Sequence, residues 1–288
     1  MRLGLFTCLI MIAFAANSVF NRMAVNGGYI DPSSFATLRT LSGALFLSAW
    51  VLLRRQPITL LSKDRIVGGL SLSAYMLGFS LAYTILDAGL GALILFGTVQ
   101  VSMFTWASVF GSRPSILQLI GASVAFGGLL VALWPQNGGP ENYLYGAALM
   151  VIAGLGWAAY SLAGRSSKDP LLSTAANFII SVPIVLLFSM GSIHQLTFTG
   201  GALAVLAGSI TSGVGYALWY SILAHLSAQT AAVVQLSVPI IAIAVGAIFL
   251  HEPADMGLLL ATILVLGGIA ISILSPKRPT ERTGDGVA

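Results

Sequence analysis

The sequence predicts an all-α integral membrane protein in which ten transmembrane helices form two inverted five-helix repeats around a central cavity. Three observations predict this fold. The 288 residues are 57% hydrophobic and only 8% charged, whereas about 25% of residues are charged in a typical soluble domain. Apolar runs of roughly the 20 residues that a bilayer-spanning helix needs recur ten times. A stretch in the middle of the chain also matches one near its end, with one charge reversed.

The first five predicted spans cover residues 3–20, 34–53, 66–86, 88–110 and 116–134. A Pro/Gly-rich segment at 135–143 separates them from the second five, at 144–163, 173–191, 203–223, 228–250 and 256–275. The connections are short, so a soluble domain does not fit between the spans. The predicted organisation is therefore a first repeat at 1–135, a second, inverted repeat at 144–275 and a polar cytoplasmic tail at 276–288.

The first span has the features of a cleaved signal peptide, because Arg2 precedes an apolar run that contains small residues. However, residues 15–18 and Arg22 match residues 158–161 and Arg165 at a constant offset. This match predicts that the first span is retained as a helix. Cys8, the lone cysteine, excludes an intrachain disulfide and a cysteine zinc cluster, and no metal or other cofactor is predicted.

The duplication is aligned by placing Pro114 on Pro253. The equivalent pairs are then Phe110 with Phe249, Gly128 with Gly267, and Arg113 with Glu252, and upstream Gly78 with Gly215 and Tyr83 with Tyr220. Five spans are an odd number, so the second repeat enters the membrane inverted. Opposed repeats in one bilayer are the architecture of carriers that work by alternating access.

The distribution of basic residues predicts the orientation of the chain. With the N-terminus in the cytoplasm, 11 of the 13 Lys and Arg residues fall on the cytoplasmic side, as the positive-inside rule requires. They are Arg2, Arg54, Arg55, Lys63, Arg65, Arg113, Arg165, Lys168, Lys277, Arg278 and Arg282. This bias predicts a multi-pass protein of the cell inner membrane with both termini in the cytoplasm. It also accounts for the net charge of +4, so no nucleic-acid partner is expected.

The spans, the repeats and two short motifs resemble the EamA family of the drug/metabolite transporter superfamily. The motifs are Phe35-Ala36-Thr37-Leu38-Arg39 in the second span and the acidic turn Leu250-His251-Glu252-Pro253. The resemblance implies that helices 1, 3, 4, 6, 8 and 9 surround a cavity and that helices 5 and 10 pack outside. It also implies export of amino acids, other small metabolites or drugs. The chain departs from the family at Arg113, where the first copy usually carries a glutamate.

Polar side chains at mid-membrane depth are costly and are functional candidates by default. Asn17 lies in the first span, Gln100 near the centre of the fourth, and Gln235 in the ninth. The alignment pairs Phe96 with Gln235, and Phe96 shares a helix face with Gln100. We expect these residues to bind substrate. The alternative is that the glutamines only join neighbouring helices, which contributes about 0.6 kcal/mol.

Aromatic side chains recur at helical spacing and form a second candidate set for substrate binding. They are Tyr75, Phe79, Tyr83, Trp157, Tyr160 and Tyr216. Such a wall suits a flat apolar or aromatic solute and can hold an ammonium group by cation–π attraction. The alternative is plain packing between helices.

Three further residues are candidates for structural or gating roles. Arg39 is the single basic residue inside a predicted span; we expect it to snorkel outward and meet Asp31 or Asp87. The alternative is a carboxylate anchor near the outer mouth. Pro239 can kink the ninth helix. Glu252, beside a proline, is expected to be a turn or capping residue.

Together these features predict a membrane carrier that exports small metabolites, with amino acids, including aromatic ones, as the leading class. A phosphorylated cargo would need several pore Lys or Arg residues, and a proton antiporter would need a deeply buried acid; the sequence offers neither. A channel-like pore for small solutes is an alternative. A membrane-embedded enzyme is another, but its metal ligands or nucleophile with a base are not apparent. The sequence does not predict the oligomeric state.

Overall fold

The computed structural model describes residues 2–110, 115–133, 142–190, 195–226, 231, 234–235, 237–253 and 255–273. Arg113, Pro114, most of the 135–143 segment and the tail at 276–288 lie outside these residues. The helices are α1 (Arg2–Asn26), α2 (Pro32–Leu53), α3 (Lys63–Ala82), α4 (Ala88–Phe110), α5 (Ile116–Leu133), α6 (Tyr143–Gly164), α7 (Pro170–Ser189), α8 (Phe198–Leu206), η1 (Ala207–Val214), α9 (Gly215–Leu223), α11 (Ser237–Phe249) and α12 (Met256–Ile273).

The predicted fold of ten membrane helices is confirmed. Seven described helices are long and apolar enough to cross a membrane, and α5, α11 and α12 are shorter. The eighth span consists of α8, η1 and α9, which run on as one helix with a π-helical segment in its middle. The first helix extends to Asn26, past the predicted end at residue 20, because Arg22 is paired with acidic groups inside the bundle.

Local sequence signals explain where several helices begin. The side chain of Asp31 accepts a hydrogen bond from the Ser34 amide, and Asp169 accepts one from the Leu172 amide. In both cases proline follows as the first helical residue, where its missing N–H has no cost. Thr197 caps α8 in the same way. These caps satisfy amide groups that no helix can pair internally.

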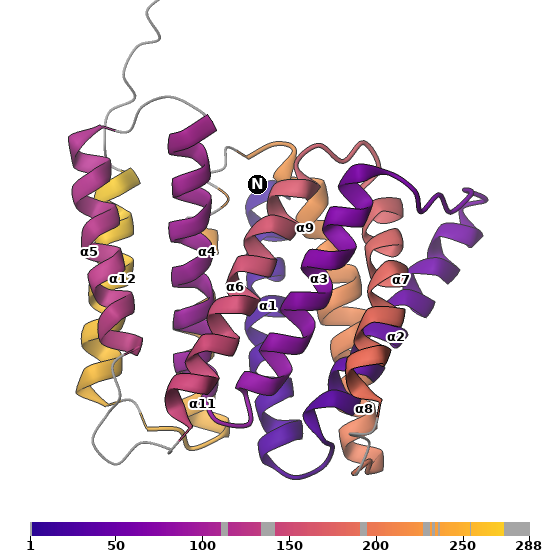
Figure 1. Ribbon diagram of the computed structural model, residues 1–288, viewed down its shortest axis with the longest axis horizontal. Coiled ribbons are helices and arrows are strands. Elements are labelled where there is room, and N and C mark those ends of the chain that lie inside the picture. The colour runs from indigo at the N-terminus through magenta and orange to yellow at the C-terminus, as the bar shows by residue number, and fades with distance from the viewer. Residues whose placement is uncertain are drawn as a thin grey trace, which may run out of the picture.

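Contacts between loops show which helix ends lie together. Ile30 between α1 and α2 bridges to Leu196 before α8. At the other end, Ser166 after α6 donates a hydrogen bond to Asp64 at the start of α3. Successive helices therefore run in alternating directions, and the second five are inverted relative to the first (Figure 1). We call the end with the α2–α3 and α6–α7 loops the basic end, and the end with Asp31, Asp87 and Glu252 the acidic end.

The helix contacts repeat across the two halves. α3 packs on α6, and the equivalent η1 and α9 pack on α1. α2 packs on α7, α4 on α11, and α5 on α12, so these pairs join equivalent helices of the two halves. α5 and α12 lie side by side at one edge of the bundle (Figure 1). Large apolar side chains such as Leu9, Ile120 and Ile263 are exposed along the helices, as expected for surfaces that face lipid.

A glycine brings α2 against the π-helical segment of the eighth span. A Cβ atom at Gly208 would clash with Ser42 Oγ and the carbonyl oxygen of Arg39. The bare backbone therefore permits the close approach that small residues provide in membrane bundles. As a result, residue 39 of α2 lies directly opposite Ser212 of η1.

Two adjacent glycines of α12 offer a test of the contact with α5. A Cβ atom at Gly268 would lie 2.5 Å from the Gly121 carbonyl oxygen, whereas one at Gly267 would meet nothing within 4 Å. We expect Gly268→Ala to cost about 1–3 kcal/mol through overpacking and Gly267→Ala to be neutral or stabilising. The thermal midpoints of both variants in detergent measure this difference, and equal midpoints would contradict the described contact.

Candidate functional site

The most unusual side chain of the bundle is Arg39 of α2. It lies about 10 Å along the helix axis from the first residue of α2, and the residue is 0% exposed. Its Nε donates to Ser212 Oγ at 2.8 Å, and its Nη2 donates to the hydroxyls of Tyr216 at 2.7 Å and Tyr75 at 3.2 Å. Its guanidinium carbon also lies 5.0 Å from the centre of the Phe79 ring. We call Arg39, Tyr75, Phe79, Ser212 and Tyr216 the Arg39 cluster.

The Arg39 cluster holds a positive charge with neutral groups. Within the described part of the chain, no carboxylate lies within ion-pair distance of Arg39, and its Nη1 is buried without a hydrogen-bond partner. A central arginine costs at least about 2.5–3.5 kcal/mol in a membrane. Charge-assisted hydrogen bonds contribute about 1.5–3 kcal/mol each, and the rings add cation–π attraction. The cluster therefore stabilises the charge and still leaves one donor group for an anion.

The expectation that Arg39 snorkels toward Asp31 or Asp87 is not met by this geometry. Asp31 caps α2, and Asp87 pairs with Arg22 on α1. The Arg39 side chain instead points into the bundle, because hydroxyl groups from α3, η1 and α9 converge on it. Two other helices supply these hydroxyls, α3 and the continuous helix that contains η1 and α9, so the spacing within the second span could not reveal them.

Most of the predicted aromatic residues meet in one buried group around Trp157. Its ring centre lies 4.6 Å from Tyr216, 5.0 Å from Tyr75 and 5.2 Å from Tyr160. Phe14 of α1, which the sequence did not single out, packs on Trp157 at 5.1 Å. The rings fill the centre of the bundle with edge and stacked contacts.

Hydrogen bonds attach two predicted polar residues to this group. Asn17 Oδ1 accepts from the hydroxyls of Thr211 and Ser212 on η1. Gln235 Oε1 accepts from Trp157 Nε1 at 2.7 Å. The bonds of Asn17 join the two halves, whereas the Trp157–Gln235 bond lies within the second half. The π-helical segment thus presents Ser212 to Arg39 and to Asn17 at once, which fits the frequent occurrence of π-bulges at functional sites.

The remaining predicted residues lie elsewhere. Phe96 and Gln100 are buried on α4, and Gln100 Oε1 has no hydrogen-bond partner in the described structure. Tyr83 lies nearer the acidic end, where its hydroxyl donates to the Ala88 carbonyl. Pro239 is the third residue of α11, where it needs no N–H partner. A turn at Gln235 precedes it, so the ninth span is interrupted here.

A cavity of about 720 Å³ lies between the two halves toward the basic end. Helices α3, α4, α6 and α9 line it, with apolar residues such as Trp106 and Leu155 on its walls and with Lys63, Asp64 and Arg165 near its mouth. Its described lining includes none of the ten predicted substrate-binding residues. All ten of those residues are buried in this conformation.

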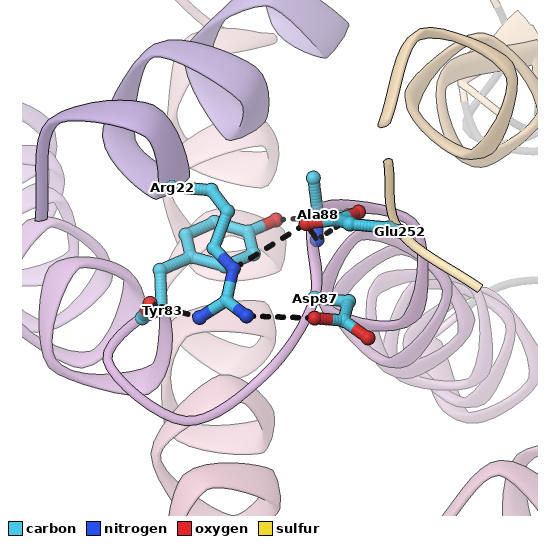
Figure 2. A network of polar contacts seen from close by, with 5 residues as sticks. All are labelled: Arg22, Tyr83, Asp87, Ala88 and Glu252. Carbon is cyan, nitrogen blue, oxygen red and sulfur yellow. Dashed lines mark hydrogen bonds and ion pairs between the residues drawn. The ribbon is translucent and has the colours of Figure 1, made fainter. Parts of the chain in front are cut away.

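A network of charges closes the acidic end (Figure 2). Arg22 of α1 pairs with Asp87 at 2.7 Å and with Glu252 at 3.3 Å, and its Nη1 donates to the Tyr83 carbonyl. Both carboxylate oxygens of Glu252 accept from the Ala88 amide at 2.9 Å. Glu252 therefore caps α4, a helix of the opposite half, where the helix dipole favours negative charge. We call Arg22, Tyr83, Asp87, Ala88 and Glu252 the acidic-end network.

The surroundings of Glu252 act on its carboxyl group in opposite directions. Burial raises the pKa of Glu252 above its ordinary value, and the negative charge of Asp87 acts in the same direction, while the Ala88 amide and Arg22 oppose both. Although it caps α4 and pairs with an arginine, this carboxyl group therefore binds a proton more readily than an exposed one.

Sequence reasoning missed Arg22 and Ser212 as functional candidates. Arg22 follows the predicted first span and is absent from the basic residues of the cytoplasmic side, and this exception was a usable signal. Ser212 carried no signal, because a serine in an apolar span commonly bonds its own helix backbone. Only its position opposite Arg39 distinguishes it.

The fold and these buried groups define a helical membrane transporter built from two inverted repeats. The model of the EamA-like transporter family matches residues 2–134 and 144–274. The chain therefore belongs to the EamA-like transporter family, within the drug/metabolite transporter superfamily, and is a multi-pass membrane transporter.

Several known proteins are similar to the chain over nearly its whole length. An uncharacterized protein of Pseudomonas aeruginosa is 44% identical over 275 residues, which cover 95% of this chain and 94% of that protein. A probable amino-acid metabolite efflux pump of Salmonella typhimurium is 24% identical over 285 residues, 94% of each chain. Its namesake in Escherichia coli is 23% identical over 290 residues, also 94% of each. A crystal structure described only as that of a protein shares the fold, with a TM-score of 0.71 at 15% identity over 95% of this chain and 98% of its own.

The Trp157–Gln235 hydrogen bond can be tested without removing the ring. Trp157→Phe keeps an aromatic side chain but leaves Gln235 Oε1 without its donor. We expect a loss of about 1–3 kcal/mol in stability, the cost of a buried unsatisfied acceptor, measured as a lower thermal midpoint in detergent. Adding Gln235→Leu should recover most of it. Trp106→Phe, at a half-exposed site, is the matched control and should leave the midpoint unchanged.

Proposed function

We propose that the protein exports small zwitterionic metabolites, with amino acids that carry aromatic or apolar side chains as the leading class, by alternating access. The observation that carries this proposal is the Arg39 cluster. A buried guanidinium with one unused donor group matches a carboxylate. The rings of Tyr75, Phe79, Trp157 and Tyr216 offer a surface for an apolar side chain and for an ammonium group. Arg39 thus acts as the carboxylate anchor of the site.

The names of two relatives support this class of cargo, since both are described as probable amino-acid metabolite efflux pumps. At 23–24% identity this support does not extend to a particular amino acid. The absence of other Arg or Lys side chains from the Arg39 cluster also favours a single carboxylate over a phosphate group, which several cations usually bind.

We further propose that the basic end faces the cytoplasm and that the protein resides in the cell inner membrane. Lys63, Arg65, Arg165 and Lys168 lie at the basic end, together with the start of α1. The positive-inside rule favours this orientation. The cavity at the basic end then admits solute from the cytoplasm, which agrees with export.

Carriers and channels differ in a measurable way. In proteoliposomes, a carrier shows saturable uptake and counterflow of a labelled amino acid against an unlabelled one, whereas a pore shows uptake that does not saturate and no counterflow. Counterflow supports the proposed function. Non-saturating uptake without counterflow would replace the carrier by a pore, and no uptake of any of the amino acids would reject this class of cargo.

The role of Arg39 can be tested by comparing an aromatic amino acid with its amide, which lacks the carboxylate. The wild-type protein should prefer the amino acid by about 10- to 100-fold in apparent affinity, the value of a charge-assisted hydrogen bond of about 1.5–3 kcal/mol. Arg39→Lys should weaken this preference, because an ammonium group cannot reproduce the planar fork. If Arg39 were only structural, the variant would lower stability and rate but keep the preference.

Gln100 offers a second test, because its Oε1 is buried without a partner. Replacing it by Met, of similar size, removes a polar atom whose burial is unfavourable. We expect Gln100→Met to keep or raise the thermal midpoint and to lower the counterflow rate. Gln235→Met, which removes a satisfied acceptor, is the matched control and should lower the midpoint. Wild-type counterflow from Gln100→Met would exclude a substrate role for this residue.

A further inference from the structure

The acidic-end network joins the two halves through Glu252. Arg22 and Asp87 both belong to the first half, whereas Glu252 belongs to the second. The Arg22–Glu252 ion pair and the Glu252–Ala88 hydrogen bonds therefore cross between halves, and the Arg22–Asp87 pair does not. Any movement that separates the halves at this end must break the contacts of Glu252 and leaves those of Asp87 intact.

The repeat gives the basic end a different set of charges. The alignment places Arg165 at the position of Arg22 and Arg113 at the position of Glu252. Arg113 lies outside the described residues, so this comparison rests on the sequence. Two arginines repel each other. The ion pair between the halves therefore lies at the acidic end, whereas the cavity of about 720 Å³ lies toward the basic end.

The network separates water at the acidic end from the interior. A cavity of about 390 Å³ lies on its outer side, bordered by Arg22, Asp87 and Glu252. On the inner side, Ser18 lies one turn before Arg22 on α1 and is buried. The side chains of Arg22 and Glu252 are only 12% and 9% exposed, and that of Asp87 is 35% exposed. Glu252 therefore borders the outer cavity although its side chain is nearly buried.

The charges at this site leave Glu252 open to protonation. One guanidinium serves two carboxylates, and burial raises the pKa of Glu252. The charged or titratable groups around it are Arg22 from α1, Tyr83 from α3, Asp87 from the α3–α4 turn, Tyr29 from the α1–α2 loop, and His251 and Asp255 from its own turn. When Glu252 takes up a proton from solvent, Arg22 keeps its charge and its pair with Asp87, while the contact between halves loses its electrostatic attraction.

We propose that the acidic-end network is a gate and that Glu252 is its proton-binding site, so that protonation of Glu252 favours opening toward the acidic end. This inference rests on the proposed alternating-access function. It goes beyond the expectation from sequence, which gave Glu252 a role as a turn or capping residue and found no deeply buried acid for proton coupling. The proposal also gives a reason for the glycine at position 246, because a Cβ atom there would clash with Glu252 Oε2.

The gate can be tested by the accessibility of a cysteine just inside it. The exposed Cys8 is first replaced by Ser, and Ser18→Cys then serves as the reporter for a membrane-impermeant thiol reagent added at the acidic end. Labelling of Tyr29→Cys, at an exposed site (41%) on the same end, corrects for the effect of pH on thiol chemistry. We expect the corrected labelling of the full-length protein to rise as the pH falls from neutral to mildly acidic.

Two neighbouring substitutions separate the gate from general charge effects. Glu252→Gln should raise labelling at neutral pH by about tenfold, which corresponds to about 1.4 kcal/mol, and should abolish the pH response. Asp87→Asn removes a carboxylate from the same arginine within one half. It should keep the low labelling at neutral pH and move the pH response toward lower pH, because Asp87 no longer raises the pKa of Glu252. Arg22→Gln removes the other partner of the Arg22–Glu252 ion pair. It is used in place of the Glu252→Gln variant if that variant does not fold.

Labelling that stays constant with pH in the parent protein, or a parental rate in Glu252→Gln, would overturn the proposal. An equal effect of Asp87→Asn would also overturn it, because the crossing between halves would then not matter. The reporter needs no substrate, so the test is independent of cargo. If labelling depends on Glu252 as expected but no counterflow is observed, the proposed cargo is rejected and the proposed gate is not.

Discussion

The organisation of this bundle depends on the burial of one guanidinium without a carboxylate. Arg39 is held by the hydroxyl group of Tyr75 on α3 and by those of Ser212 and Tyr216 on the eighth span. Each hydroxyl must lie within hydrogen-bond distance, because an unpaired donor at this depth is costly. The positions of α2, α3, η1 and α9 are therefore linked through one side chain. The single unused donor, Nη1, is the feature on which the proposed carboxylate site rests.

Close backbone approach makes this arrangement possible. Gly208 permits α2 to touch η1, and the π-helical geometry of η1 aims Ser212 at both Arg39 and Asn17. Without a hydrophobic driving force between helices in lipid, such packing and the hydrogen bonds across it provide much of the association energy. The aromatic rings around Trp157 then fill the space between the halves. With so many shared contacts the proposed site is closed in this conformation, and in the proposed alternating-access cycle the halves move together to admit a solute.

The two ends of the bundle differ although the repeats are related. Equivalent helices make equivalent contacts, but the charges at equivalent turns are opposite in sign. Acidic residues on one turn allow an ion pair between halves, and arginine at the matching turn does not. An inverted duplication under the positive-inside rule produces this difference, because the same turn must serve opposite faces of the membrane. The proposed proton-dependent gate is thus a consequence of the topology as well as of Glu252 itself.

The sequence by itself determined the ten spans, the inverted halves and the family, because length, hydropathy and charge bias are properties of each segment taken alone. It also selected Trp157, Tyr216 and Asn17 as buried candidates, since polar and aromatic groups stand out in apolar helices. Only the tertiary structure decided that Arg39 points inward, that Arg22 and not Arg39 meets Asp87, and that Glu252 caps a helix of the other half. Those contacts join residues up to 230 positions apart. No periodicity within a span encodes such a partner, because the partner is set by how the helices pack.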